Sequence, residues 1–412
     1  MHSDHLKIEF EKILNRKYFT QLLHPYRKAA FAEFQKHGFP NQNWEDWRFT
    51  NIKDITNGNY NIAELIDSPN NDINWDKYKL NNIKTIIIYN GHIQKNQFTN
   101  QKGFALLNGL DYFKKMNGKL ETSNNSPFDL LNTAFTDSSI NIIVNKNTSV
   151  KQILRLLFIS DGDRPIMINP RININLDTSG KLTLIEEYIG NATSFFHNES
   201  LFISLKNNSH LEHIRLQSNS NYTHNIANIN INQLSDSKYN YIQFSDGGKL
   251  SRSNVYANLN KPNSECNLNY LSLSKNNQHM DNNIVINHNS HSTHSTQFIK
   301  SILSDKSSGV FNGRTVVNEN AIKITAKQIN NNLLVSDNAT MNSNPQLEIY
   351  ADEVKCSHGS TTGQIDKESL FYLQSRGIKR TTALQLMVQG FANEIIDKVD
   401  NTLINNKLLS KL

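Results

Sequence analysis

The sequence predicts a mainly β protein with a helical region at each end, and three observations lead to this fold class. Residues 140–359 form one short run after another in which apolar and polar residues alternate, bounded by Asn, Ser, Asp or Gly. The runs are too many for one ordinary sandwich, and Asn-Gly hairpin dipeptides are scarce between them. Sandwiches, barrels and β-helices all fit many short strands. These features favour a solenoid in which inward residues and Asn side chains stack in ladders, although the strict repeat of hexapeptide solenoids is absent.

The amino-terminal part is predicted to be mixed and mostly helical. Apolar side chains recur at three- and four-residue spacing within residues 5–52, as far as a glycine stop at Gly38. Pro40 begins an irregular stretch with Trp44 and Trp47, which we expect to anchor this loop onto the core. From about residue 84 the pattern becomes strand-like in KTIIIYNGHI, and mixed helix and loop follow to about residue 136.

The carboxyl-terminal part returns to helical periodicity after Gly363. Asp366 is placed as the N-cap of a helix that Gly377 ends, and a second helix is expected to start near Thr381, another capping residue. The second helix carries a broad apolar stripe, and packing on the core accounts for part of it. The stripe consists of Leu384, Met387, Val388, Phe391, Ile395 and Val399. We therefore expect three regions: residues 1–136, a solenoid core at 137–363, and a helical region at 364–412.

Composition excludes several classes of protein. Hydrophobic residues make up 37% and charged residues only 19%, with Asn and Ser filling the deficit, and apolar periodicity persists throughout, so the chain is not a disordered one. The net charge of +6 is scattered, without the tracts of basic and aromatic residues that bind nucleic acids. Two cysteines are too few for a disulfide-built secreted domain. With neither a signal-peptide core nor a membrane-length apolar stretch, we expect a cytoplasmic protein with no membrane partner.

The segment at residues 352–378, DEVKCSHGSTTGQIDKESLFYLQSRGI, carries the most chemical information. It opens as a strand, on which Cys356 and His358 point to the same face. A thiol and an imidazole are plausible soft metal ligands, but two ligands cannot complete a tetrahedral iron or zinc site. If the pair binds metal, the other ligands come from another chain. Otherwise His358 is a structural hydrogen-bonding group and Cys356 a small buried apolar residue.

Other candidate residues favour structural interpretations. The tract HNSHSTH holds His288, His291 and His294, of which His288 and His294 share a face if the tract is a strand. Structural or incidental histidines are the better interpretation there, with His279 and His288 the two most able to matter. Cys266 is expected in the core. The glycine-rich turns lack the spacing of a phosphate loop, so we expect this chain to bind no nucleotide itself. The adjacent acidic residues at 186 and 187 cannot be assigned as a catalytic pair from the sequence.

Several segments together resemble the SufD type of the SufB/SufD family, whose members assemble iron–sulfur clusters. The matching segments appear in the family's order: FPNQNWEDWRFTNI (39–52), PRININLDTSGKLTLIEEYIG (170–190), SDGGKLSRSNVYANL (245–259), SILSDKSSGVFNGRTVV (301–317) and most of residues 326–364. The likeness is dense from about residue 165 to 395 and thin from about 55 to 135. It implies a right-handed parallel β-helix flanked by helical amino- and carboxyl-terminal regions.

The resemblance also implies a function. In SufD the histidine that matches His358 lies at the interface with SufB, where a transient iron–sulfur cluster forms, and a cysteine often stands at the position of Cys356. The terminal helices dock the ATPase SufC, which points to Leu384, Met387 and Phe391 as partner-binding residues. Leu373 stands where SufB-type sequences carry a sulfur-accepting cysteine. We therefore expect a non-enzymatic scaffold subunit that pairs with SufB, or with a second copy of itself when alone.

Two other classes of protein remain open from the sequence. A solenoid enzyme acting on polysaccharides has the same strand pattern, but it is usually secreted and needs a catalytic cluster along one groove. A passive adhesin or coat protein leaves the Cys-x-His strand and the helical ends unexplained.

Overall fold

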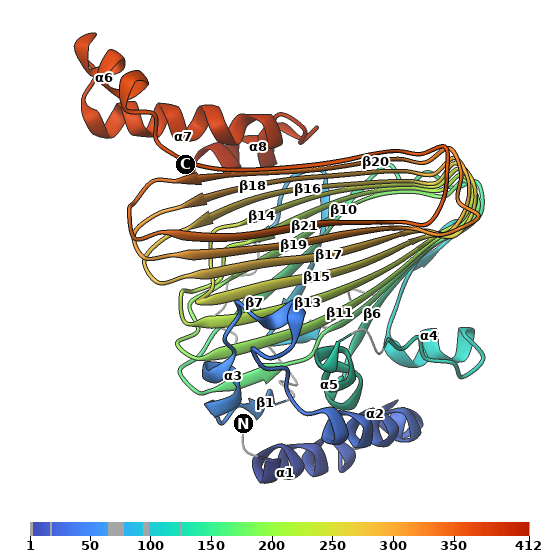
Figure 1. Cartoon of the computed structure of the whole chain (residues 1–412). Coiled ribbons are helices and arrows are strands. Elements are labelled where there is room, and N and C mark those ends of the chain that lie inside the picture. Colours follow the sequence, from blue (N-terminus) through green and yellow to red (C-terminus); the bar gives the residue numbers. More distant parts are fainter. Residues whose placement is uncertain (1–2, 17–18, 65–77, 94–98, 124–125, 412) are drawn as a thin grey trace.

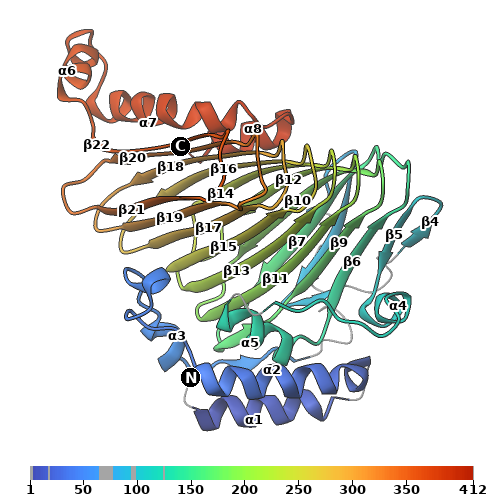
Figure 2. The same ribbon diagram turned by 45° about the vertical axis from the view of Figure 1, so that its right-hand side comes forward.

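The computed structural model describes residues 3–16, 19–64, 78–93, 99–123 and 126–411. Between residues 139 and 364 the strands form two facing sheets (Figures 1 and 2), and over most of this length they alternate between the sheets along the chain. Between residues 195 and 334 each strand pairs in parallel with the strands two positions before and after it, in a register without slips, for example Val255 with Ile284. From residue 171 to residue 364 successive strands lie in opposite sheets, so no hairpin joins them. The predicted mainly β, parallel β-helix is confirmed.

The first sheet consists of twelve strands in the described residues. They are β1 (Asn61–Ile62), β4 (Thr99–Gln101), β5 (Phe104–Leu107), β6 (Ser139–Val144), β8 (Ile166–Ile168), β9 (Arg171–Leu176), β11 (Phe195–Leu205), β13 (Thr223–Gln233), β15 (Leu250–Leu259), β17 (His279–His288), β19 (Ser308–Val317) and β21 (Thr340–Ile349). The second sheet is formed by β2 (Ile83–Tyr89), β3 (His92–Ile93), β7 (Ile153–Ser160), β10 (Lys181–Gly190), β12 (His210–Gln217), β14 (Lys238–Ser245), β16 (Glu265–Ser274), β18 (His294–Leu303), β20 (Thr325–Leu334) and β22 (Lys355–Gln364). The strand predicted from about residue 84 is β2.

The helices lie before and after the long strands of the solenoid. They are α1 (Ser3–Leu14), η1 (Phe19–Leu23), α2 (His24–His37), η2 (Glu45–Trp47), α3 (Lys53–Asn57), α4 (Gly109–Lys115), α5 (Pro127–Phe135), α6 (Lys367–Ser375), α7 (Arg380–Ile396) and α8 (Thr402–Leu409). None of the described helices is long and apolar enough to cross a membrane. The division into three regions at residues 136 and 363 stays a prediction.

The core is built from ladders of identical or similar side chains. Alternate residues of each strand point between the two sheets, where Ile229, Val255 and Ile284 stack in register and are fully buried. The predicted asparagine ladders also occur. Asn254 Nδ2 donates to Asn228 Oδ1 at 2.9 Å, and Asn283 Nδ2 donates to Asn254 Oδ1 at 3.5 Å. Such ladders satisfy amides that would otherwise be buried without partners, since a buried polar group needs a hydrogen bond.

The helices of the amino-terminal region pack on the outer face of the first sheet. Side chains of α1, α2 and α5 share one apolar cluster with Ile226 and Leu250 of the sheet. Trp47 is 4% exposed and lies against the guanidinium of Arg252, 3.8 Å from its ring centroid, while Trp44 packs at the edge of the cluster. The expected anchoring role of both tryptophans is confirmed. The predicted stop is confirmed as well, since Gly38 has a φ of 69° and caps α2; residues 17 and 18 lie outside the described ranges.

The carboxyl-terminal helices pack on the outer face of the second sheet, where α7 and α8 share an apolar cluster with Ile214, Ile242 and Leu271. Asp366 caps α6 as predicted, because its carboxylate accepts from the backbone N–H groups of Glu368 and Ser369. The predicted start of the second helix near Thr381 is confirmed, since α7 begins at Arg380, but the predicted capping role of Thr381 is wrong. The chain leaves the turn after α6 in an extended conformation only as far as Lys379, so Thr381 lies inside the first turn of α7 and caps nothing.

Candidate functional site

The last coil of the solenoid leaves one end of the molecule open. Among the described residues, β22 pairs only with β20 and β21 only with β19, so each strand has one unpaired edge. Their side chains are mostly exposed or half-buried, whereas those of β17 and β18 are mostly buried. Instead of capping this end, α7 and α8 pack on the second sheet, and α6 projects from the body (Figure 2). Unpaired strand edges present free N–H and C=O groups to another chain.

Cys356 and His358 lie on this last strand and face the interior side of the open end. In the parallel register Cys356 is the partner of Ala326 and His358 the partner of Gln328, and both partners are buried in the interior. Two residues further on, Ser360 contacts Ser343 of the opposite sheet at 2.8 Å, as alternation requires for the same face. The predicted shared face of the two candidate ligands is therefore the interior face at the open end of the solenoid.

The environments of the two side chains differ. His358 is exposed, and Cys356 is half-buried against an apolar cluster that includes Ala321, Ile324 and Ala326. Burial raises the pKa of the Cys356 thiol, although a backbone N–H from Ala326 opposes the rise. Because the thiolate is the ligand form, this setting favours His358 as the more available group. No set of three His, Cys, Asp or Glu side chains arranged to hold a metal ion occurs in the described residues.

The other histidines and the second cysteine have structural roles. A turn separates His288, at the end of β17, from His294, at the start of β18, so the two do not share one strand as the sequence pattern allowed. His288 is fully buried and bonds to the hydroxyls of Thr293 and Ser295 at 2.7 and 2.9 Å. Cys266 is fully buried in the solenoid core, as expected.

His279, the other histidine singled out by the sequence, joins the amino-terminal region to the solenoid. Its ring lies 2.9 Å from the Thr50 hydroxyl and 2.7 Å from the Ser308 hydroxyl. Both ring nitrogens are thus engaged within the chain, and this arrangement supports a structural role.

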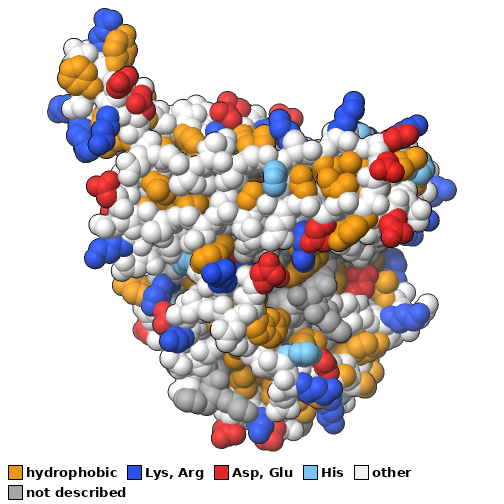
Figure 3. Space-filling view, in the orientation of Figure 1, with side chains coloured by type: hydrophobic (Ala, Val, Ile, Leu, Met, Phe, Trp, Pro, Cys, Tyr) orange, Lys and Arg blue, Asp and Glu red, His pale blue; other side chains and the backbone are white. Residues whose placement is uncertain are grey.

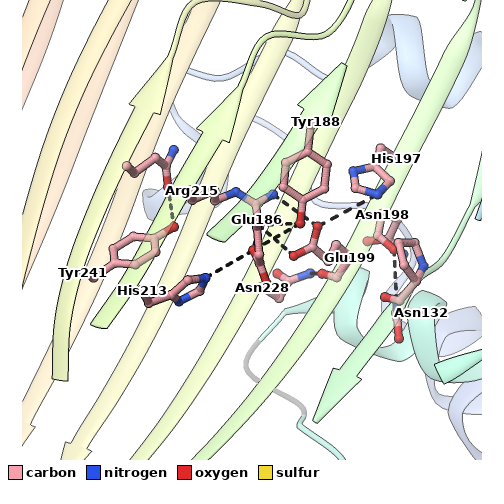
Figure 4. Close-up of polar contacts among 12 residues, drawn as sticks. Asn132, Glu186, Tyr188, His197, Asn198, Glu199, His213, Arg215, Asn228 and Tyr241 are labelled. Atoms are coloured by element: carbon pink, nitrogen blue, oxygen red, sulfur yellow. Dashed lines mark hydrogen bonds and ion pairs between the residues drawn. The ribbon is translucent and has the colours of Figure 1, made fainter. Parts of the chain in front are cut away.

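A second cluster of titratable side chains lies inside the solenoid (Figure 4) and was not predicted from the sequence. Arg215 donates to Glu186 at 2.8 Å and to Glu199 at 2.7 Å, and its guanidinium lies 4.2 Å from the ring centroid of Tyr188. His213 Nε2 lies 3.4 Å from Glu186 Oε2. The ionic side chains are at most 3% exposed. Three strands bring these residues together, because β10 and β12 pair in the second sheet and β11 of the first sheet faces them.

The two buried carboxyl groups of this cluster differ in the direction of their pKa shifts. Burial raises the pKa of Glu199 even though Arg215 opposes the rise. Burial also acts on Glu186, but His213 and Arg215 together hold its pKa below the usual range. The two carboxyl groups beside Arg215 therefore shift in opposite directions, Glu199 holding its proton more readily than usual and Glu186 less readily. Sealed from solvent, the cluster fixes the packing of the sheets and has no access for a substrate.

The acidic residues at 186 and 187 point to opposite faces of β10. Glu186 lies in the interior, whereas Glu187 pairs on the outer face with Arg155 at 2.6 Å and also with Lys407 of α8. They do not form the side-by-side carboxylate pair that glycoside hydrolysis uses.

The residues predicted to bind a partner on α7 are half-buried. Leu384 and Met387 are partly accessible, and Phe391 packs toward the second sheet, with the ammonium of Lys300 4.3 Å from its ring centroid. The larger apolar exposure lies on α6, which projects from the body of the molecule (Figures 1 and 3). There Phe371 is 72% and Tyr372 55% exposed. This aromatic pair was not predicted to bind a partner. The sequence does place it on the short helix that begins after the Asp366 cap.

Two family models together match most of this chain. Residues 158–391 match the family model "SUF system FeS cluster assembly, SufBD core domain", and residues 8–156 match that of the SufBD protein N-terminal region. The chain is 28% identical to the iron–sulfur cluster assembly protein SufD of Escherichia coli over 94% of this chain and 92% of that protein. It is 33% identical to an iron–sulfur cluster assembly SufBD family protein of Synechocystis over 70% of this chain and 66% of that protein. The chain therefore belongs to the SufBD family of the SUF system for iron–sulfur cluster assembly.

Proposed function

We propose that this chain is a non-enzymatic scaffold subunit that pairs with SufB through its open end, and that a nascent iron–sulfur cluster is held at that interface. The single observation that carries the proposal is the position of His358. It lies exposed on the terminal strand β22, on the face that opens toward a partner. The cluster is the cargo of the complex and not a resident cofactor of this chain.

The edge of β22 is the better of the two free edges for pairing. Its ten residues contain no proline, so every residue keeps a backbone N–H. β21 contains Pro345, which has no N–H to donate. A partner strand added to β22 continues the ladder of the second sheet and covers the interior side of the open end. In the absence of SufB, a second copy of this chain is the alternative occupant.

The chemistry of the pair suits a cluster that must be released. Neutral imidazole is a borderline ligand for iron, and mixed His and Cys ligation occurs in known clusters. His358 is the first candidate ligand, and Cys356 becomes a ligand only if a bound iron draws the proton from its half-buried thiol. SufB supplies the remaining ligands, because these two side chains cannot complete a site by themselves.

The carboxyl-terminal helices are proposed to dock the ATPase SufC. Phe371, Tyr372 and Leu386, at 72%, 55% and 46% exposure, supply the apolar surface, and Leu384 and Met387 extend it. Phe391 is assigned mainly to anchoring, because it packs on the second sheet. Movement of the docked ATPase would then act on α7, which rests on the sheet that ends in β22, and so reshape the interface at His358.

Copurification and reconstitution test this proposal. The chain is expressed with SufB and SufC, isolated by size-exclusion chromatography, and reconstituted anaerobically with iron and sulfide. We expect a three-protein complex with a visible chromophore that His358→Ala largely abolishes. Ser357→Ala is the matched control, since this neighbour on β22 faces the other side. An unchanged chromophore in His358→Ala refutes the ligand assignment. Failure to form any complex refutes the scaffold proposal and favours the polysaccharide-active solenoid.

A further inference from the structure

His358 stands at the end of a column of glutamines in the solenoid interior. In the second sheet Gln297 of β18 is the register partner of Gln328 on β20, which is the partner of His358 on β22. Successive members of such a column lie about 4.8 Å apart. Gln297 and Gln328 are 0% and 1% exposed. The column therefore leads from the core directly to the exposed imidazole.

One hydroxyl of the opposite sheet fixes the orientation of both amides. Thr315 Oγ1 accepts from Gln297 Nε2 at 3.1 Å and from Gln328 Nε2 at 2.9 Å. Both NH₂ groups are thus turned toward Thr315. The carbonyl oxygens point away from it, and within the described residues neither Gln297 Oε1 nor Gln328 Oε1 accepts a hydrogen bond although both are buried. A buried acceptor without a donor is destabilising, because it has lost its hydrogen bonds to water.

We propose that Gln328 is a positioning residue for His358, and that its Oε1 accepts a hydrogen bond from one ring N–H of the imidazole. This inference rests on the proposed function for its significance. The bond fixes the tautomer of His358 and turns the other ring nitrogen, with its lone pair, toward the open end. Histidines that bind metals usually donate their second N–H in this way, which orients the ring and raises its basicity.

Neighbouring acceptors are already engaged or too far away. Asn330 Oδ1, two residues along the strand, accepts from Ser343 at 2.7 Å and from Ser360 at 3.3 Å. Gln297 lies one strand deeper, beneath Gln328 in the column. Gln328 is the column's last member before His358, and the exposed imidazole is free to rotate over its oxygen.

The tautomer of His358 in the isolated chain tests the proposal directly. The chain is labelled with ¹⁵N-histidine, and long-range ¹⁵N–¹H correlation spectra are recorded at about pH 8.5, above the usual titration range of imidazole. The His358 signals are assigned by their absence in His358→Asn. We expect one dominant tautomer in the natural sequence, and a two- to tenfold change in the tautomer ratio in Gln328→Met, corresponding to the loss of about one hydrogen bond.

Two further variants separate positioning from a general effect on the core. Gln297→Met removes the same amide one strand deeper and should leave the His358 signals unchanged. Gln328→Glu keeps an acceptor oxygen and should retain the natural tautomer. An unchanged ratio in Gln328→Met, or an equal change in Gln297→Met, would overturn the proposal. No iron or partner is present in this experiment, so its outcome is independent of whether a cluster forms at the interface.

Discussion

Single residues show how the coils determine the protonation of buried groups, and His288 is a clear example. Burial lowers its pKa to about 4, from an ordinary value of 6.5, and nearby His294 adds to the effect. The folded state therefore favours the neutral ring, and the unfolded chain takes up the proton first as the pH falls. This histidine contributes stability above pH 6.5 that is lost as the pH falls toward 4.

The corresponding prediction concerns acid unfolding. Between pH 6.5 and 4 the natural protein should lose more stability than His288→Gln. The difference should be on the order of 3 kcal/mol in the free energy of unfolding. The measurement is urea unfolding of both proteins at a series of pH values. His291→Gln is the matched control, because that ring is exposed in the adjacent turn. If the free energy of unfolding depended on pH in the same way in the natural protein and in His288→Gln, protonation of His288 would not be a cause of the acid sensitivity.

A residue's role could be predicted from the sequence where it depends on neighbours within the same helix or strand. The cap at Asp366 and the shared face of Cys356 and His358 follow from spacing along one element, and both are found in the structure. The cluster of Glu186, Glu199 and Arg215 could not be predicted from spacing along one element. These side chains meet only because β10 and β12 pair in one register and β11 of the opposite sheet faces them.

Among the elements, the turns between the two sheets show a residue pattern that also indicates a solenoid and was not used in the prediction. Ser179, Asn208, Asp236 and Asn263 each have a φ of 56° to 60°, and each lies in the turn that leads from the first sheet to the second. Asn and Asp tolerate this left-handed conformation better than most residues, and a residue with positive φ recurs in this turn once per coil. Stacked side chains such as Asn258 and Asn287 are 29 residues apart. This period distinguishes a solenoid from a sandwich more directly than the scarcity of hairpin dipeptides.

The attachment of α7 depends strongly on one lysine of the second sheet. Lys300 is 2% exposed and forms an ion pair with Glu394 at 3.1 Å. Its ammonium also donates to the backbone oxygen of Phe391 at 2.8 Å, and it lies over the ring of that residue. Truncating this side chain removes the ion pair, the hydrogen bond and the packing of its aliphatic stem at once.

We therefore predict that Lys300→Ala loosens the docked half of α7. The free energy of local opening should fall by about 1–3 kcal/mol, which is a loss of amide protection of about 5- to 150-fold. Hydrogen exchange followed by mass spectrometry over residues 388–399 measures it. Lys398→Ala is the control, because Lys398 is exposed and its ammonium lies farther from an aromatic ring, 5.8 Å from that of Phe298. Equal loss of amide protection in both variants would show that Lys300 does not hold α7 on the sheet more strongly than Lys398 does.

At the scale of the whole molecule, the chain has two separate surfaces that we propose for interaction with partners. The open end presents β21 and β22 with His358, and α6 presents Phe371 and Tyr372 away from the body. The sequence predicted the strand, the helices and the candidate ligands. It could not predict that the terminal helices leave the last coil uncovered, because that depends on α7 and α8 packing beside the sheet and not over its edge.

The central claim is that His358 contributes a ligand to a cluster formed between this chain and SufB, and nitrogen coupling tests it most directly. The complex with SufB and SufC is reconstituted with iron and sulfide, with ¹⁵N-histidine in this chain alone. After one-electron reduction, electron–nuclear double resonance detects nitrogen bound to iron. We predict a strongly coupled ¹⁵N signal that persists in His291→Gln and disappears in His358→Ala. A reduced cluster without such a signal, or a signal that survives His358→Ala, would contradict the claim.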